Sequence, residues 1–249
     1  MIELTGVRKA FGRQVVLDGV DFRVQEGQTV ALLGPSGTGK SVLLKHINGL
    51  IRPDAGRVVV DGREVGTLDR AALRQLRQRI GYVFQYGALF DSLDVFENVR
   101  LGIADEAKFR DLAYARERVR WAILSVNLAP EVIDKMPAEL SGGMKKRVGI
   151  ARAIAGELDY ILYDEPTSGL DPVNADIIDR LVSQLAGELG VTSVMVTHDV
   201  RGAFRVADRI ALLADGRLVL EGTPAEFRAS DDPRVRAFLA RDFDEARAA

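Results

Sequence analysis

The most constraining feature of the sequence is the segment GPSGTGKS at residues 34–41, because of what stands on each side of it. The run VALL before it has the length and apolar composition of a buried parallel strand, and SVLLKHINGL after it is typical of a helix. Glycines at 34, 37 and 39 let successive backbone N–H groups turn inward around an anion. The pattern G-x-x-x-x-G-K-[ST] between a strand and a helix therefore predicts a nucleotide phosphate loop in an α/β fold.

Each polar group of this loop has an expected task. Lys40 can reach the β- and γ-phosphates, and the Ser41 hydroxyl can bind Mg²⁺. The start of the helix adds a partial positive charge. The residues expected to bind the nucleotide here are Gly34, Pro35, Ser36, Gly37, Thr38, Gly39, Lys40, Ser41 and Val42.

Length and charge limit the remaining possibilities. A chain of 249 residues fits one large α/β domain, and its net charge of −2 disfavours nucleic acid as the main partner. No cysteine is present, which excludes disulfides and Cys-ligated metals. The N-terminal residues have no apolar segment typical of a signal peptide, and no apolar run reaches the length of a membrane span. We expect membrane contact only through a partner.

The rest of the chain alternates between strand and helix patterns, with one long helical interruption. Residues 1–32 are predicted as strands, 71–80 as a helix with Ile80 on its apolar stripe, and GYVFQ as a strand. Later segments predict a strand at 160–163, a helix at 173–187, a strand at 192–197, a short helix at 200–206 and a hairpin around Asp215 and Gly216. The predicted organisation is a catalytic core of residues 1–86 and 157–224, a helical subdomain of 87–156 and a helical tail of 225–249. Four apolar residues have helical spacing in the tail, which are Val235, Phe238, Leu239 and Phe243.

A second glycine-rich helix start lies in LSGGMKKR at 140–147. Ser141 is a good N-cap, and Gly142 and Gly143 leave backbone amides uncovered. One interpretation is an ordinary capped helix. The other is a second anion site, which would serve a different nucleotide because the first loop already encloses its own. In a two-fold dimer, each subunit's Ser141 would face the γ-phosphate bound by the other. The basic run at 145–147 is interpreted as a solvated helix face.

Two acidic residues close the apolar strand YILY. Asp164 and Glu165 would be poor structural residues at the end of a buried strand, which favours a functional role. Asp164 suits Mg²⁺, directly or through water, and Glu165 suits a general base that polarises the attacking water.

Taken together and in order, these motifs resemble those of ATP-binding-cassette (ABC) ATPases over essentially the whole chain. The set comprises Walker A GPSGTGKS, the Q-loop Gln85, the signature LSGGM, Walker B YILYDEP, the D-loop SGLD and the switch His198 in VTHD. The resemblance implies a P-loop NTPase fold with a RecA-like core, an N-terminal antiparallel β part and an inserted helical subdomain, with ATP and Mg²⁺ as cofactors. One departure is Met144, which stands where the commonest signature has glutamine and cannot donate a hydrogen bond.

The resemblance also implies roles for residues outside the first loop. Gln85 would link Mg²⁺ and the attacking water to the helical subdomain, and His198 would sense the γ-phosphate. Asp171 would lie across the dimer interface with Ser141, Gly142 and Gly143, although it could also cap the helix that begins at Pro172. Phe11 would stack on adenine, or could equally be a core residue, and Val16 joins it in the ATP-binding set.

Three further segments resemble the ATPases of the Mla and Mce-associated phospholipid transporters. They are FQYGALFDSLDVFENV at 84–99, the signature ELSGGMKKR at 139–147 with its methionine, and DPRVRAFL at 232–239. This implies a homodimer, peripheral on the cytoplasmic face of the inner membrane, with an MlaE-like permease, an MCE-domain (MlaD-like) protein and in some systems a small STAS-domain protein. The alternatives are the ATPase of a small-solute importer and a soluble regulator or repair ATPase, the latter disfavoured by the missing coiled-coil arm. Apolar residues around the Q-loop could dock the permease or form the subdomain's own core, and they are Tyr86, Leu89, Phe90, Leu93 and Phe96.

Overall fold

The computed structural model describes the backbone of residues 1–248 and the side chains of residues 1–240. The chain forms two compact units. The first contains Met1–Leu73 and the chain from Thr192 onward, and the second contains Arg74–Val191.

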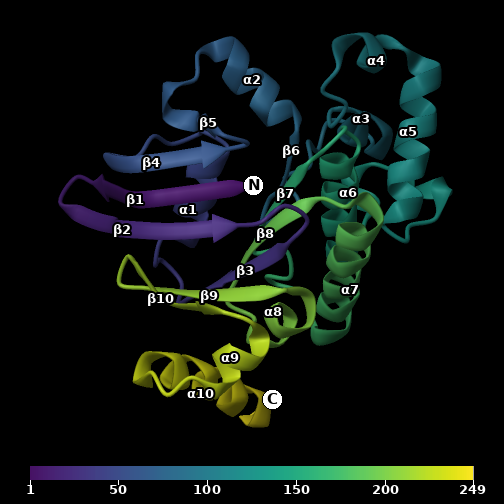
Figure 1. The fold of residues 1–249 in the computed structure, drawn as a ribbon. Coiled ribbons are helices and arrows are strands. Elements are labelled where there is room, and N and C mark those ends of the chain that lie inside the picture. The colour runs from purple at the N-terminus through teal and green to yellow at the C-terminus, as the bar shows by residue number, and fades with distance from the viewer. Residues whose placement is uncertain (249) are drawn as a thin grey trace. The chain divides into compact units, whose positions relative to one another are not determined.

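An antiparallel sheet opens the first unit (Figure 1). Its strand order is β2-β1-β4-β5, and the register places Ile2 opposite both Val24 and Val60. Residues of β1 that alternate along the strand, Ile2 and Leu4, are buried, as expected for a sheet with one apolar face. The strands are β1 (Ile2–Phe11), β2 (Gln14–Val24), β4 (Ala55–Val60) and β5 (Arg63–Glu64).

A second group of strands in the first unit has the order β10-β9-β3-β8. The central strand β3 is parallel to both β8 and β9, and all five of its residues are buried, which confirms the prediction from VALL. Because parallel strands end on the same side, the segments that follow β3 and β8 leave this sheet at one edge. These strands are β3 (Thr29–Leu33), β8 (Thr192–Thr197), β9 (Arg209–Ala214) and β10 (Arg217–Gly222).

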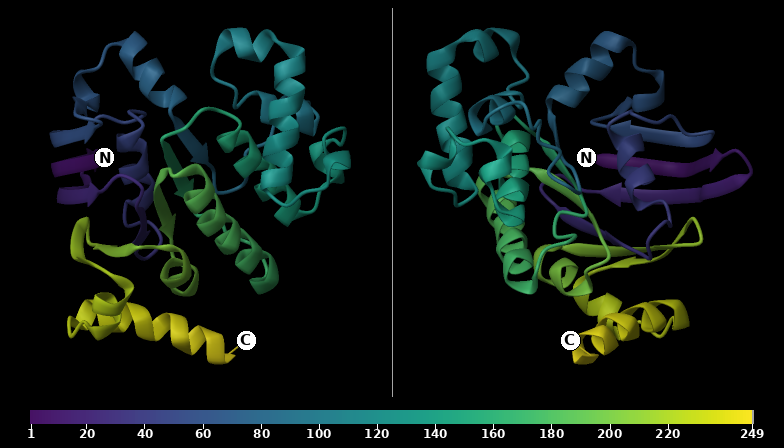
Figure 2. Two further views of the ribbon diagram at one scale, coloured as in Figure 1. Left: turned by 45° about the vertical axis from the view of Figure 1, so that its right-hand side comes forward. Right: turned by 180° about the vertical axis from the view of Figure 1, so that it is seen from behind.

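The helices of the first unit include those that end the chain. Both α9 and α10 contact β10, and Val235 of α10 is fully buried. Figure 2 shows these two helices in yellow at the end of the chain. The predicted apolar residue Phe243 lies outside the described side chains. The helices are α1 (Lys40–Ile47), the 3-10 helix η1 (Val65–Thr67), α8 (Val200–Val206), α9 (Pro224–Ala229) and α10 (Pro233–Ala248).

The second unit contains one parallel strand pair and a group of helices. Strand β6 (Ile80–Val83) pairs with β7 (Tyr160–Asp164), with Val83 opposite Tyr163. Helix α2 (Arg70–Gln78), which contains the boundary between the units, ends before Ile80. The prediction that Ile80 belongs to the helix was therefore wrong, because this residue begins β6 and is buried there.

Helices α3, α5 and α6 pack against one another. The Arg118 guanidinium of α5 donates hydrogen bonds to the backbone oxygens of Ile154, Ala155 and Gly156, which fixes the end of α6. None of the helices in residues 1–248 has the length and apolar content of a membrane span. The helices are α3 (Val95–Arg100), α4 (Glu106–Arg110), α5 (Leu112–Ser125), η2 (Pro130–Val132), η3 (Pro137–Glu139), α6 (Gly142–Ile154) and α7 (Pro172–Leu189).

Candidate functional site

The phosphate loop connects the end of β3 to the start of α1 and requires glycine at its last position. Gly39 caps α1 with φ of 101°, a conformation that side chains with a Cβ rarely adopt. A Cβ there would also lie 2.8 Å from Cγ1 of Val16. Val16, which the sequence placed in the ATP-binding set, therefore packs directly on the loop.

Lys40 lies inside the turn that this loop makes. Its side chain is buried, and Nζ donates hydrogen bonds to the backbone oxygens of Gly34 at 2.7 Å and Pro35 at 3.0 Å. The Thr38 hydroxyl also donates to the Pro35 oxygen, at 2.8 Å. No side chain caps the start of α1 and its first turn has no acidic residue. The helix start therefore keeps its partial positive charge, which suits an anion such as phosphate.

His198 belongs to the same edge of this sheet as the loop. Leu33, the last residue of β3, is opposite Thr197, the last residue of β8, and His198 follows directly. The next residue, Asp199, caps α8 by accepting a hydrogen bond from the backbone N–H of Gly202 at 3.0 Å. The short turn between strand and cap holds His198 at the edge with its side chain exposed.

Phe11, the last residue of β1, is 50% exposed. The interpretation that it is a core residue is therefore wrong. The Nζ of Lys9 lies 5.6 Å from the centroid of the ring. An exposed ring beside a cation can stack on a planar base.

In the second unit, the two predicted carboxylates close β7. Asp164 is its last residue and Glu165 follows, and both are buried. The Tyr82 hydroxyl donates a hydrogen bond to Oδ2 of Asp164 at 2.9 Å, and burial, with the Asp164 charge, raises the pKa of Tyr82. Tyr82 therefore stays protonated and orients this carboxylate. Glu165 has φ of 51°, a strained conformation for a residue with a Cβ, as is common at functional sites.

Gln85 is close to the same edge because β6 and β7 are parallel and in register. It lies two residues after the last residue of β6, not within the strand. Its Nε2 donates to the Ser168 hydroxyl at 3.2 Å, which leaves the amide oxygen available as an acceptor. Sequence analysis gave no role to Tyr82, which lies in a predicted strand, or to Ser168, although Ser168 is the first residue of the D-loop motif SGLD.

The second glycine-rich helix start is formed as the sequence predicts. Ser141 caps α6 by accepting from the backbone N–H of Met144 at 3.3 Å, and Ser141 and Gly142 are both exposed. A Cβ on Gly143 would lie 2.8 Å from Oδ1 of Asn174, so this glycine allows the close approach of α7.

Asp171 caps the helix α7. It accepts hydrogen bonds from the backbone N–H groups of Val173 at 3.0 Å and Asn174 at 3.1 Å, which confirms the cap interpretation. The Asn174 amide also donates to its Oδ2, and this bond lowers the pKa of Asp171. The carboxylate stays ionised and connects the start of α7 to Asn174, the residue next to Gly143.

The basic run at 145–147 is not a solvated helix face. Lys146 is only 8% exposed and its Nζ donates to the backbone oxygen of Ser168, while Arg147 donates to the Asn127 oxygen at 2.9 Å. The helical spacing contained a signal for this. Residue 146 lies three positions after buried Gly143 and four before buried Ile150, on one stripe of α6.

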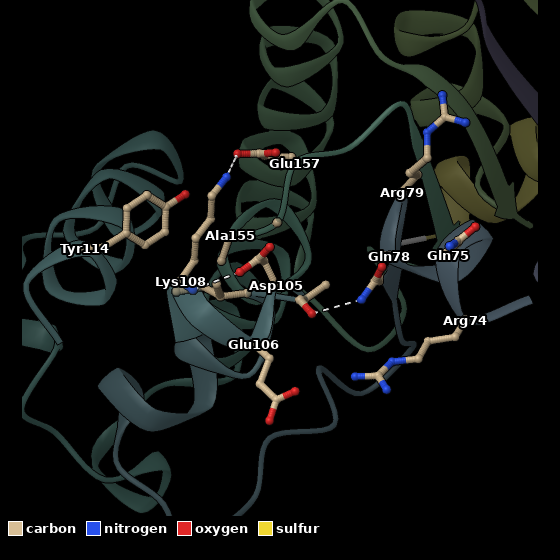
Figure 3. Close-up of a pocket in the computed structure, with 13 residues that line it drawn as sticks. Arg74, Gln75, Gln78, Arg79, Asp105, Glu106, Lys108, Tyr114, Ala155 and Glu157 are labelled. Carbon is tan, nitrogen blue, oxygen red and sulfur yellow. Dashed lines mark hydrogen bonds and ion pairs between the residues drawn. The ribbon is translucent and has the colours of Figure 1, made fainter. Parts of the chain in front are cut away.

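A cavity of ≈ 390 Å³ lies elsewhere in the second unit. Figure 3 shows Lys108 reaching Glu157 across it, and Gln78 bound to the Ala104 oxygen at 3.0 Å. None of the predicted site residues lines it. Among the charged residues that line it, Lys108 and Glu157 form an ion pair with each other.

Comparisons with known proteins agree with these motifs. The sequence model of the family described as "ABC transporter" matches residues 17–168. The intermembrane phospholipid transport system ATP-binding protein MlaF of Escherichia coli (strain K12) is 37% identical over 240 residues, 96% of this chain and 88% of MlaF. MlaF of Haemophilus influenzae is 36% identical, over 98% of this chain and 92% of that protein.

Two further proteins are similar. The probable ribonucleotide transport ATP-binding protein mkl of Mycobacterium tuberculosis (strain H37Rv) is 37% identical over 96% of this chain, but the match covers 66% of mkl. The solved dimer of the ATP-binding cassette MJ0796 with ADP and Pi has a TM-score of 0.81 and 35% identity, covering 90% of this chain and 99% of that one. The chain therefore belongs to the ABC transporter family and is an ATP-binding, ATP-hydrolysing subunit of such a transporter.

Proposed function

We propose that this ATPase powers the movement of phospholipid between membranes. The observation that carries the proposal is the similarity to MlaF from two genera, which extends over 88–92% of those proteins and 96–98% of this chain. The signature methionine and the residues after Gln85 support it further. These residues differ between branches of the family, whereas the catalytic motifs are shared by all branches.

In this proposal the phosphate loop binds ATP through its amides and Lys40, and Phe11 stacks on the adenine. Glu165 polarises the attacking water, and His198 contacts the γ-phosphate. Mg²⁺, when bound, would neutralise phosphate charge. The donors proposed to hold it fit this ion, because it prefers hard oxygen ligands. They are the Ser41 hydroxyl, the Asp164 carboxylate that Tyr82 orients, and the amide oxygen that Gln85 keeps available.

We also propose a homodimer in which Ser141, Gly142, Gly143 and Asp171 complete the partner subunit's ATP site. The exposure of residues 141 and 142 supports this, since an uncovered helix start can receive a phosphate from outside its own subunit. So does the dimeric state of the cassette solved with ADP and Pi. ATP-driven closure of the dimer and its release after hydrolysis would then form the transport cycle.

The segment after Gln85 is proposed to dock an MlaE-like permease. Asn98 is fully buried and holds this loop by accepting from the Phe90 backbone N–H at 2.8 Å and donating to the backbone oxygens of Phe90 and Leu93. Tyr86 is 80% exposed and Phe90 56% exposed. A firmly held loop with two exposed aromatic rings suits the binding of a partner helix.

An MCE-domain protein, and in the Mla version a small STAS-domain protein, would complete the assembly. The ATPase would then be peripheral on the cytoplasmic face of the inner membrane. The second candidate is the transport of a small solute such as a ribonucleotide, which the equal identity of 37% to mkl favours.

Purification from native membranes in mild detergent, followed by mass spectrometry of the accompanying proteins and lipids, tests the choice. Phospholipid transport predicts an MlaE-like permease, an MCE-domain protein and enriched phospholipid. A permease with a solute-binding protein and no enriched lipid would overturn the substrate and leave the ATPase assignment intact.

A further inference from the structure

Lys146 is a buried cation that none of the roles above uses. It lies in the second turn of α6, five residues after the Ser141 cap, and is 8% exposed. Nζ donates to the backbone oxygen of Ser168 at 2.5 Å. Burying an ammonium group costs free energy unless polar partners compensate it, so its retention here calls for a specific partner.

Ser168 connects Lys146 to both residues proposed to handle the attacking water. Its backbone N–H donates to the backbone oxygen of Glu165 at 3.2 Å, and its hydroxyl accepts from Nε2 of Gln85 at 3.2 Å. Its backbone oxygen accepts from Lys146. All three polar groups of this residue are therefore occupied, each by a different segment of the second unit.

The positive charge of Lys146 also interacts with Glu165. Burial lowers the pKa of Lys146 to about 8, and the opposing influence is the nearby carboxylate of Glu165. Glu165 is thus the charged group that compensates the buried ammonium.

We propose that Lys146 is a positioning residue for ATP hydrolysis, because its ammonium holds the turn after Glu165 against α6 and so fixes both Glu165 and the hydroxyl that binds Gln85. This inference rests on the proposed roles of Gln85 and Glu165. It assigns to α6 a second task within its own subunit, in addition to presenting Ser141 to a partner.

Steady-state ATP hydrolysis by the membrane-purified complex tests this with three variants. Lys146→Met keeps the length of the side chain and removes its charge, Lys146→Arg keeps the charge, and Lys145→Met is the matched control on the neighbouring lysine. We expect Lys146→Met to lower kcat roughly tenfold or more with little change in KM, since the effect is on alignment and not on ATP binding. Arginine should restore most of kcat, and Lys145→Met should leave it unchanged.

An unchanged kcat in Lys146→Met would overturn the proposal, as would equal losses in the arginine and methionine variants at an unchanged melting temperature. Failure of Glu165→Gln to lower hydrolysis would instead remove the base assignment, so the two failures are distinguishable.

A pH profile keeps the proposal testable even if Lys146→Met does not fold. As the pH rises through about 8, Lys146 loses its proton and its charge beside Glu165, whereas arginine at this position stays charged. The activity of the natural protein should therefore fall more steeply between about pH 7.5 and 9.5 than that of Lys146→Arg. Parallel profiles for the two proteins would contradict the proposal.

Discussion

Leu33 and Thr197 are directly opposite each other at the ends of the parallel strands β3 and β8. This single register relation places the phosphate loop, which begins at Gly34, and His198 at the same edge of one sheet. Val83 and Tyr163 have the same relation in the second unit, where Gln85 follows the end of β6 and Asp164 ends β7. The predicted site residues therefore lie at the carboxyl ends of parallel strands, where ligands bind in open α/β sheets.

Replacing the proposed base should stop hydrolysis but not ATP binding. Glu165→Gln keeps the shape of the side chain and removes its capacity to accept a proton, so we expect the rate to fall by about 100-fold or more. Bound ATP should then accumulate and stabilise the dimer, measurable by nucleotide retention and sedimentation. The matched control is Glu157→Gln, an exposed glutamate paired with Lys108, which should hydrolyse ATP normally. Normal hydrolysis by Glu165→Gln would show that the base is another group.

The last glycine of the phosphate loop should tolerate no side chain. Gly39→Ala adds a Cβ at φ of 101° and brings it 2.8 Å from Val16, so the loop must shift. A strain of about 1–3 kcal/mol predicts ATP binding weakened roughly tenfold or more, measurable by titration with a fluorescent nucleotide.

Gly187→Ala is the control for that change, because Gly187 lies within α7, is exposed and has open space around it. Alanine there should stabilise the protein by about 0.5–1 kcal/mol and leave ATP binding unaltered. Equal ATP affinity in the two variants would contradict the account of the loop.

Removing the Ser141 cap should lower both stability and ATP hydrolysis, whereas removing the Thr223 cap should lower stability alone. Ser141→Ala and Thr223→Ala each remove an N-cap hydroxyl, on α6 and α9, and each should cost about 1 kcal/mol of stability in a denaturant titration. Only Ser141→Ala should also lose ATP hydrolysis, because only that hydroxyl is proposed to bind a phosphate. Similar hydrolysis by the two variants would leave Ser141 with a structural role alone.

Sequence reasoning succeeded where a local pattern decides the structure. The continuous apolar runs identified β3, β7 and β8, and the cap residues Ser141 and Asp171 identified the starts of α6 and α7. The predictions from sequence failed where contacts between distant segments of the chain determine the structure. Ile80 continued a helical stripe in spacing, but pairing with Tyr160 placed it in β6. Lys146 stood in a basic run typical of a surface, and although its helical spacing indicated the buried stripe, its partner Ser168, 22 residues away, could not be identified from the sequence.

The exposed aromatic ring of Phe90 should matter for coupling and not for ATP binding. Phe90→Ala removes a ring that is 56% exposed, on a loop that Asn98 holds in place through backbone contacts. We expect a normal melting temperature and ATP affinity, with a loss of several-fold in transport per ATP hydrolysed. Leu112→Ala, at 51% exposure on α5, is the control and should couple normally. Equal losses in binding and transport would indicate misfolding.

The most direct test of the central claim is ATP-driven transfer of labelled phospholipid by the complex reconstituted into liposomes, with acceptor liposomes to collect it. The natural complex should transfer phospholipid when ATP and Mg²⁺ are added, and the same complex with Glu165→Gln should transfer none above background. Hydrolysis without any lipid transfer, or transfer that is identical in the Glu165→Gln complex, would contradict the claim that this ATPase powers phospholipid transport.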